Sequence, residues 1–226
     1  MDERATGLLL RTYPLTESSL IVHWLTREQG RIATVAKGAR RPKSSFRGKL
    51  DLFFLCELSF LRSRRSELHN LKEVTLVESQ PALRHDLSLL RRAAYASALV
   101  QQTTESDSPV PEIYELLVGF LRALPRSGSA LRVLAFEIKL LRLLGLAPDA
   151  GATELSAGSK RSLIYLSESG WEMLERFKLS EVQFRELRRF LHGFLIYHLD
   201  KFPPGRSQAL DESADAISRA SKSSAK

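Results

Sequence analysis

The sequence predicts an α+β chain in which a five-stranded β-barrel is followed by an α-helical domain. Two observations support this division. Up to Ser79, short segments that alternate apolar with polar residues are separated by turn-forming residues, which is typical of β-strands. After Pro81, apolar residues recur with a period near 3.6, which is typical of amphipathic helices. We therefore expect domains over residues 1–80 and 81–204, and a disordered tail, poor in apolar residues, over 205–226.

The first domain is expected to hold five strands. They cover, in order, residues 7–13, 20–26, 31–37, 52–61 and 68–78. The sequence Arg27-Glu28-Gln29-Gly30 suits a tight hairpin turn between the second and third strands. Five short strands with basic loops between them indicate a small closed or partly closed barrel of the oligonucleotide-binding (OB) type.

The segment over residues 31–49, RIATVAKGARRPKSSFRGK, contains seven cations and no Asp or Glu. Gly38, Pro42 and Gly48 interrupt the strand that begins it, so we expect a mobile loop crowded with positive charge. Such a loop favours a polyanion, and nucleic-acid phosphate is the commonest one. A solvated surface loop that binds nothing is the alternative.

A second basic cluster, Arg62, Arg64 and Arg65, lies in the loop before the fifth strand, near the binding edge of an OB barrel. Within the first loop, Phe46 is a candidate for stacking on a base. The other large aromatic residues of this domain are expected in its core, because large aromatics are more often buried than exposed. They are Trp24, Phe53, Phe54 and Phe60.

The second domain is expected to begin with two amphipathic helices. The first starts near Leu83 and is about 22 residues long, judged from its apolar stripe. Residues 106–111 interrupt the pattern. Pro111 is well placed in the first turn of the next helix, and Pro125 is expected to end that helix.

Two further helices are expected beyond Ser129. One covers residues 129–144, is apolar on most of its circumference, and is capped by Gly145. The last begins at Ser180, where Ser-Glu-Val-Gln predicts a capping box, and continues to Leu199. The intervening residues 149–174 are expected to be irregular, with a short pair of strands.

Three cations of the apolar helix, Arg132, Lys139 and Arg142, fall within one quadrant of its circumference. One interpretation is the solvated face of a mostly buried helix. The other is a cationic strip beside an apolar groove, suited to an acidic peptide that ends in hydrophobic residues.

Several kinds of site are not expected. Cys56 is the only cysteine, so a disulfide and a cysteine zinc site are excluded, and this residue is expected in the core. The five histidines, at positions 23, 69, 85, 192 and 198, form no ligand-spaced pair, and no catalytic motif is present. We expect a protein without cofactor, metal or catalysis. The N-terminus lacks a signal sequence, no membrane-spanning run is present, and the net charge is +8, so we expect a cytoplasmic protein with an anionic partner.

Several segments of the chain closely resemble the RecO family of DNA repair proteins. In the first domain they are GLLLRT at 7–12, ESSL at 17–20, TREQGR at 26–31 and VAKGARRPKS at 35–44. The helical half matches more loosely, at FEIKLL (136–141), Leu144-Gly145 and Tyr197-His198-Leu199. Many members carry a four-cysteine zinc motif where this chain has residues 148–170, and no cysteine occurs there.

The resemblance implies a recombination mediator, associated with the nucleoid. Its OB domain would bind single- and double-stranded DNA, and the protein would anneal complementary strands. With RecR it would help to load RecA onto DNA coated by single-stranded DNA-binding protein (SSB), and the helical domain would receive the acidic C-terminal tail of SSB. Lys37, Arg40, Arg41, Lys43 and Arg11 match the basic motif of the family.

Together with our own reading of the loops, the expected DNA-binding residues are Arg11, Arg31, Lys37, Arg40, Arg41, Lys43, Arg47, Lys49, Arg62, Arg64 and Arg65. For the SSB tail the candidates are Arg132, Lys139 and Arg142, which follow from the helix and not from the resemblance. Two other functions remain open: an adaptor that binds acidic peptides, and an RNA-binding OB protein that acts in translation.

Overall fold

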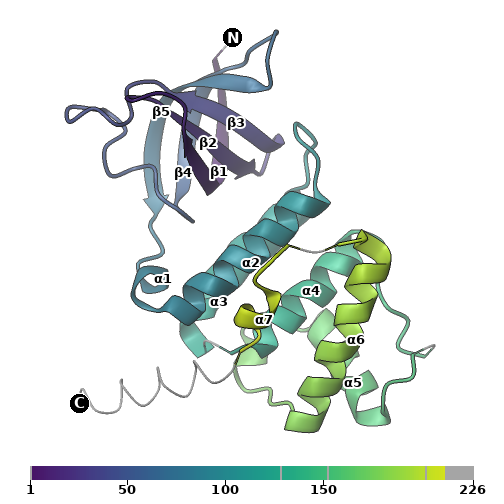
Figure 1. The fold of residues 1–226 in the computed structure, drawn as a ribbon. Helices are drawn as coiled ribbons and strands as arrows, with labels where there is room; N and C mark the ends of the chain where they lie inside the picture. Colours follow the sequence, from purple (N-terminus) through teal and green to yellow (C-terminus); the bar gives the residue numbers. More distant parts are fainter. Residues whose placement is uncertain (1, 128, 152, 202, 212–226) are drawn as a thin grey trace, which may run out of the picture. The chain divides into compact units, whose positions relative to one another are not determined.

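The structure is a computed structural model that describes residues 2–127, 129–151, 153–201 and 203–211 (Figure 1). The chain divides into two compact units. The first, which we call the barrel unit, comprises residues 1–81 and 104–115; the second, the helical unit, comprises residues 82–103 and 116–226. The expected boundary near residue 80 is therefore crossed by one segment, residues 104–115, which returns to the barrel and which we call the returning segment.

The barrel has five strands, as the sequence predicts. They are β1 (Asp2–Pro14), β2 (Leu20–Thr26), β3 (Gly30–Ala36), β4 (Leu55–Leu61) and β5 (Leu68–Glu78) (Figure 1). They close into a barrel in the order β1-β2-β3-β5-β4, antiparallel except for the parallel pair β3–β5. Closure depends on β1, which pairs first with β4 and then with β2, with a register shift between Leu9 and Arg11. This topology confirms the OB-type fold.

Alternating side chains of the strands fill the interior of the barrel. Along β3, Ile32, Thr34 and Ala36 are buried while the residues between them face outward, as the period of a strand requires. The indole Nε1 of Trp24 donates a hydrogen bond of 2.9 Å to Oγ1 of Thr34, which satisfies both polar groups inside the core. Of the aromatic residues expected in the core, Trp24, Phe54 and Phe60 belong to it, and Phe53 is buried as well.

The returning segment is attached to the start of β3. The amide of Asp107 donates to the carbonyl of Arg31 at 2.8 Å, and Ser106 forms a parallel bridge with Arg31. Gly30 makes this approach possible, because a Cβ at that position would lie 1.8 Å from the carbonyl oxygen of Ser108. Gly30 also has a φ of +70°, a conformation that costs glycine little.

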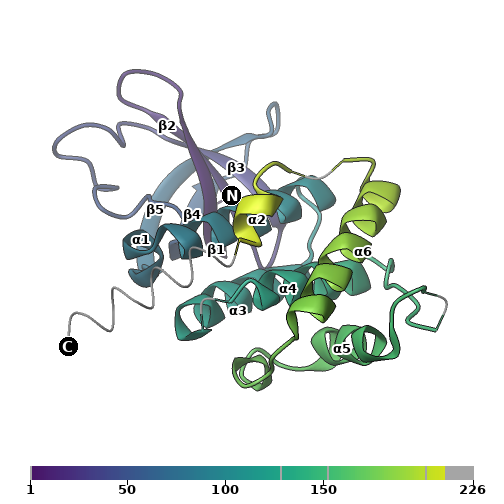
Figure 2. The ribbon, with the colours of Figure 1, turned by 60° about the horizontal axis from the view of Figure 1, so that its bottom comes forward.

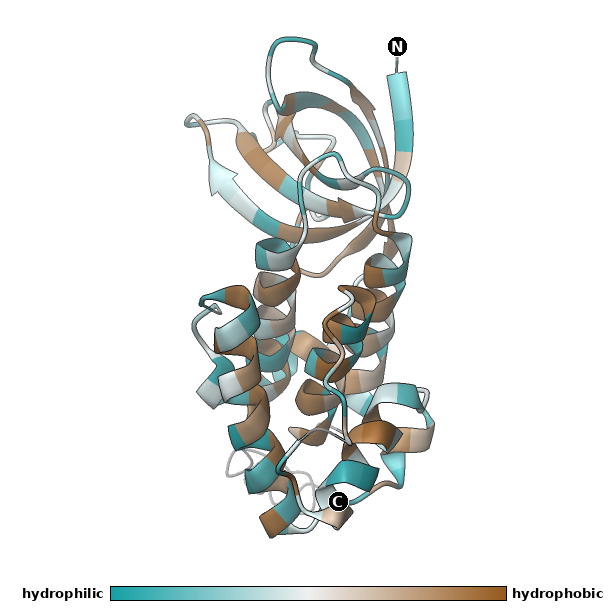
Figure 3. Ribbon diagram, turned by 90° about the vertical axis from the view of Figure 1, so that its right-hand side faces the viewer, coloured by the Kyte–Doolittle hydropathy of each residue, from teal (hydrophilic) through white to brown (hydrophobic). Residues whose placement is uncertain are grey.

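The helices are α1 (Ala82–His85), α2 (Leu87–Thr103), α3 (Pro111–Ser127), α4 (Leu131–Leu143), α5 (Ala157–Glu168), a 3₁₀ turn η1 (Met173–Glu175), α6 (Glu181–Leu199) and α7 (Arg206–Ala209). Buried on nearly every side, α4 packs against α2, α5 and α6 (Figures 1 and 2). Hydrophobic and hydrophilic residues alternate in bands along the helical ribbons, as amphipathic helices require (Figure 3). Within the described ranges, none of the helices is both long and apolar enough to cross a bilayer.

Two helix ends follow the sequence prediction. Ser180 and Gln183 form the expected capping box, in which each side chain binds the other residue's backbone amide, at the start of α6. At the end of α4, Gly145 has a φ of +74° and its amide donates to the carbonyl of Arg142.

Four predictions about the helical unit are wrong. The long first helix is two helices, because Asp86 caps α2 by accepting hydrogen bonds from the amides of Ser88 and Leu89. Pro125 lies inside α3 and does not end it. The irregular stretch contains α5, with Ser156 as its N-cap, in place of a strand pair. The tail expected to be disordered begins with α7, which is buried at Arg206 and Ala209; residues 212–226 lie outside the described part of the chain.

Candidate nucleic-acid interface

The basic loop, residues 37–49, is an ordered succession of turns. Backbone amides donate to carbonyls three residues earlier, as from Arg41 to Gly38, from Ser44 to Arg41 and from Lys49 to Phe46, all at 3.0 Å. Phe46 is 7% exposed and belongs to the hydrophobic core of the barrel. The prediction of a mobile loop is therefore wrong, and Phe46 anchors the loop where the sequence suggested that it stacks on a base.

The anchored loop presents its cations to solvent. Lys37, Arg40, Arg41, Lys43 and Arg47 are exposed, and Lys49 is partly buried. None of the six forms an ion pair with a carboxylate in the part of the chain that the structure describes. The amide of Arg40 donates to the carbonyl of Ser18 at 3.0 Å, which fixes the loop to the β1–β2 turn. The loop is thus a fixed cluster of positive charge without an internal counter-charge.

A second element of the surface lies on the outer face of β1 and β2. Nη1 of Arg11 donates to the hydroxyl of Tyr13 at 2.5 Å, and its guanidinium carbon lies 5.6 Å from the ring centroid. Tyr13 is 41% exposed and meets His23 edge-on, with the ring centroids 5.5 Å apart. Burial, with Arg11 and Arg31 nearby, lowers the pKa of His23. Tyr13 is therefore an exposed aromatic beside a cation. The sequence carries a signal for this pair, because residues i and i+2 share a strand face.

Two arginines expected at the interface are engaged within the barrel unit. Arg62 donates from Nε to Glu3 at 2.8 Å, from Nη1 to Asp107 at 2.6 Å, and from Nη2 to Gln29. The hydrogen bonds to Glu3 and Asp107 raise the pKa of Arg62, and the same contact with Arg62 lowers the pKa of Glu3. This network neutralises the guanidinium with the protein's own acids, so we withdraw Arg62 from the DNA-binding set.

Arg31 is likewise a structural residue. Its guanidinium donates two hydrogen bonds to the carbonyl of Thr104, at 3.1 Å from Nε and 2.6 Å from Nη2, and holds the returning segment. Burial lowers the pKa of Arg31. Arg64 and Arg65, by contrast, are exposed and have no carboxylate partner among the described residues. They remain in the candidate set with the basic loop.

The three cations of α4 do not form one strip. Arg132 is fully buried, with Nη2 3.8 Å from Glu175, and burial lowers its pKa. Lys139 is half-buried and donates from Nζ to the carbonyl of Ser167 at 3.0 Å. Only Arg142 is exposed. The three side chains share a quadrant of the helix but are buried to different depths, and Arg132 cannot contact a peptide at the surface.

Arg142 lies on the rim of a pocket of about 440 Å³ between α4 and α5. Its apolar lining includes Ile138, Leu163 and Ile164. Asp149 and Glu168 also line it, so the pocket is of mixed charge.

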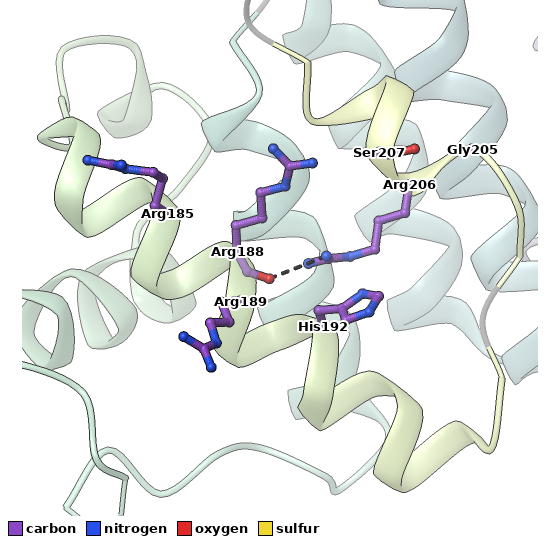
Figure 4. Close-up of a pocket in the computed structure, with 7 residues that line it drawn as sticks. All are labelled: Arg185, Arg188, Arg189, His192, Gly205, Arg206 and Ser207. Atoms are coloured by element: carbon purple, nitrogen blue, oxygen red, sulfur yellow. Dashed lines mark hydrogen bonds between the residues drawn. The ribbon is translucent and has the colours of Figure 1, made fainter.

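A further cationic site on α6 was not predicted. Arg185, Arg188, Arg189 and His192 line a pocket of about 460 Å³ together with Gly205, Arg206 and Ser207 (Figure 4). The spacing i, i+3, i+4 and i+7 places the four α6 residues on one helix face, and that spacing is the signal that sequence reasoning could have used.

The remaining reactive side chain is buried. Cys56 is fully buried, donates a weak hydrogen bond to the carbonyl of Lys49 at 3.7 Å, and has a pKa raised by burial to about 12. This confirms its expected place in the core. Among the residues that the structure describes, no three His, Cys, Asp or Glu side chains gather into a metal-binding group.

Comparison with known proteins agrees with this geometry. The family model described as "Recombination protein O N terminal" matches residues 1–80, and "Recombination protein O C terminal" matches residues 84–152. A DNA repair protein RecO of Anaeromyxobacter sp. (strain K) is 31% identical over 235 residues, covering 88% of this chain and 92% of that protein. The RecO of Exiguobacterium sibiricum is 35% identical over 207 residues, covering 89% and 82% respectively. That of Bacillus subtilis (strain 168) is 34% identical over 151 residues, covering 66% and 58%.

Proposed function

The chain belongs to the RecO family of DNA repair proteins, and we propose that it is a recombination mediator that binds single- and double-stranded DNA and anneals complementary strands. With RecR, it helps to load RecA onto SSB-coated DNA. The observation that supports this proposal best is the basic loop, whose exposed cations have no carboxylate partner in the described chain and are fixed by Phe46 and by the β1–β2 turn.

The loop binds the phosphate backbone, and the outer face of β1 adds a base contact. Each cation that neutralises a phosphate releases counterions, so on single strands log K falls by about 0.7 per phosphate for each tenfold rise in salt. Tyr13 offers an exposed ring that Arg11 orients, and stacking of one base on such a ring contributes about 1–3 kcal/mol. Because the protein contacts phosphates and the flat faces of bases, binding should not depend on the DNA sequence.

Annealing on this surface requires no chemical step. Two strands of like charge repel each other, and a cluster of guanidinium and ammonium groups screens that repulsion when both strands lie against it. The strands are then held close enough to pair. We propose that the protein is not an enzyme, and that it accelerates pairing by raising the local concentration of both strands.

The helical unit offers a site for the SSB tail. An acidic peptide that ends in hydrophobic residues needs a cation at the rim of an apolar pocket, and Arg142 beside Ile138, Leu163 and Ile164 provides that arrangement. Glu168 on the same rim opposes binding, so we expect the affinity for the tail to be modest.

Charge reversal in the basic loop tests the DNA site. Arg40→Glu/Arg41→Glu should lower the affinity for an oligonucleotide by more than tenfold and reduce the salt slope by about 1.4, two phosphates at 0.7 each. Fluorescence anisotropy at several salt concentrations measures both quantities. Lys72→Glu, on the exposed side of β5, is the matched control and should leave both unchanged. Wild-type affinity of the double variant, with a native circular dichroism spectrum, would refute the assignment.

An adaptor for acidic peptides is the second candidate, and the Arg142 pocket favours it. Arg142→Glu separates the two functions, because it should abolish binding of a fluorescent acidic peptide that ends in an apolar residue and leave DNA affinity intact. If the peptide binds the wild type and neither oligonucleotide nor annealing activity can be detected, the adaptor function replaces the mediator function.

A further inference from the structure

The outer face of α6 carries three arginines, followed by His192, that the barrel site does not use. Arg185, Arg188, Arg189 and His192 span about 10 Å along the helix axis and surround the α6 pocket (Figure 4). Arg188 and Arg189 form no ion pair with a carboxylate in the described ranges. Among the described residues, Arg185 pairs with Glu181 alone, at 3.8 Å, and both side chains of that pair are exposed, so water screens it. The face is therefore ready to bind an anion.

Next to these arginines, α6 contains a glycine that is not explained by close packing against a neighbouring side chain. Gly193 lies inside the helix, where glycine is less favourable than alanine, and it is exposed. A Cβ placed there would meet no described atom within 4 Å beyond its own helix backbone and chain neighbours. No side chain in the described part of the chain therefore requires a glycine at this position.

This glycine lies between an arginine and an exposed aromatic ring. Arg189, Gly193 and Tyr197 follow one another at i, i+4 and i+8 on one side of the helix. Tyr197 is 81% exposed, and its only aromatic neighbour in the described chain is His198, edge-on with the centroids 4.9 Å apart. Most of the ring surface is thus available to a flat ligand.

Arginines beside an exposed aromatic ring, with an exposed glycine between them, fit a single nucleic-acid strand. Phosphates pair with arginines, and a base stacks on the ring. We propose that α6 holds a second single-stranded nucleic-acid site, in which Arg188 and Arg189 bind the backbone, Gly193 lets it approach the helix, and Tyr197 stacks on a base. An acidic peptide would need only the arginines and the pocket, and would leave Gly193 and Tyr197 unexplained.

The inference extends the proposed function, because annealing acts on two strands and a second site gives the second strand a place. It depends on residues of the helical unit alone, so each site can be tested without the other. The distinction matters for the mechanism: with two sites, binding of a second oligonucleotide to the same chain should be measurable, whereas a single basic loop shares its cations between strands.

Photo-crosslinking of the full chain to a 5-iodouracil oligonucleotide locates the site directly. We expect one crosslink at Tyr197 and another in the barrel unit. Arg188→Glu/Arg189→Glu should remove the Tyr197 crosslink, lower strand affinity several-fold and reduce the salt slope by about 1.4. Arg161→Glu, a single charge reversal at an exposed position of α5, should do neither. Gly193→Leu fills the gap, and should weaken the crosslink while the melting temperature stays equal or rises.

The outcomes separate the two sites. If Arg40→Glu/Arg41→Glu leaves affinity unchanged while the Tyr197 crosslink forms, the barrel assignment fails and the α6 site stands. If crosslinks map to the barrel unit alone, or if the α6 variants bind and anneal as the wild type does, the α6 proposal is wrong. If the α6 variants no longer bind an acidic peptide that ends in an apolar residue but still bind DNA, α6 is a peptide site, and this result would also overturn the proposal.

Discussion

Arg206 and Glu137 form a two-contact ion pair in the interior of the helical unit. Nε of Arg206 lies 2.7 Å from Oε1 of Glu137, and Nη2 lies 2.8 Å from Oε2. Tyr95 donates its hydroxyl to the same Oε1 at 2.6 Å, and both charged side chains are almost fully buried. Desolvation alone would lower the pKa of Arg206, but the contacts with Glu137 raise it, so Arg206 stays charged. The pair joins α7 to α4 across 69 residues of sequence.

Removing the charge of Glu137 should destabilise the helical unit strongly. In Glu137→Gln, Arg206 keeps its charge in a buried site without a carboxylate, and breaking a buried pair in this way costs about 3–5 kcal/mol. Urea unfolding should therefore show a free energy of unfolding lower by that amount. Glu154→Gln, on an exposed loop, is the control and should change stability by less than about 0.5 kcal/mol. Equal stability of the two variants would contradict the role of the pair.

The Arg62 network should make the barrel sensitive to acid. Because Arg62 lowers the pKa of Glu3 below its ordinary 4.5, the pair stabilises the fold above that pH and loses its effect as the pH falls through the folded-state pKa. Near neutral pH, Arg62→Ala should lower the free energy of unfolding by about 1 kcal/mol, a modest amount since both side chains are about one-third exposed.

The pH dependence provides the check on that value. The difference in unfolding free energy between Arg62→Ala and the wild type should shrink as the pH is lowered below 4.5, because protonated Glu3 is neutral and no longer forms an ion pair with Arg62. Arg64→Ala, which removes an exposed arginine of the same loop, should leave the unfolding free energy unchanged at every pH. A constant difference across the pH range would show that the Glu3 contact contributes nothing.

The barrel could be predicted closely because its signals are local. β2 spans Leu20–Thr26, as expected, since alternation and the hairpin turn fix its ends. The returning segment could not be predicted, because the contact between Arg62 and Asp107 joins residues 45 apart and exists only in the folded chain. α5 was missed for a related reason: three of its twelve residues are serines, which favour helices weakly, and Glu186, from another helix, accepts hydrogen bonds from Ser156 and Ser159.

Composition located the charged surface but not the state of each charge. Arg31 lies at the start of β3 and Lys37 directly after its end, and a charge count treats them alike. Arg31 donates to Thr104 inside the barrel unit, whereas Lys37 follows the strand and is exposed. The same limit applies to Arg132 and Arg142, which share a face of α4 but differ in depth. Periodicity gives the direction of a side chain, and only packing gives its depth.

Phe46→Ala should couple the stability of the barrel to its affinity for DNA. Removing a buried aromatic side chain costs about 3–5 kcal/mol, and here it also releases the basic loop from the core. Unfolding experiments should show the loss of stability, and anisotropy should show weaker DNA binding because the freed cations must be ordered again. Phe46→Leu should restore most of both quantities. If Phe46→Ala weakened DNA binding without loss of stability, the ring would be a base contact after all.

Cys56 should behave as an internal probe of barrel opening. Its thiol is fully buried and its pKa is raised to about 12, so near pH 8 almost no thiolate forms, and reagents that attack thiolates should not label the native chain. Ser45→Cys places a second thiol in the exposed part of the basic loop, so the native variant should take up one label per chain and the wild type none. Urea should then expose Cys56 along the same curve as unfolding measured by circular dichroism. Rapid labelling of the native wild type would mean that the barrel opens near β4 without global unfolding. The hydrogen bond from the Cys56 thiol to the carbonyl of Lys49 would then break in the native state, and the end of the basic loop would not be fixed to the barrel.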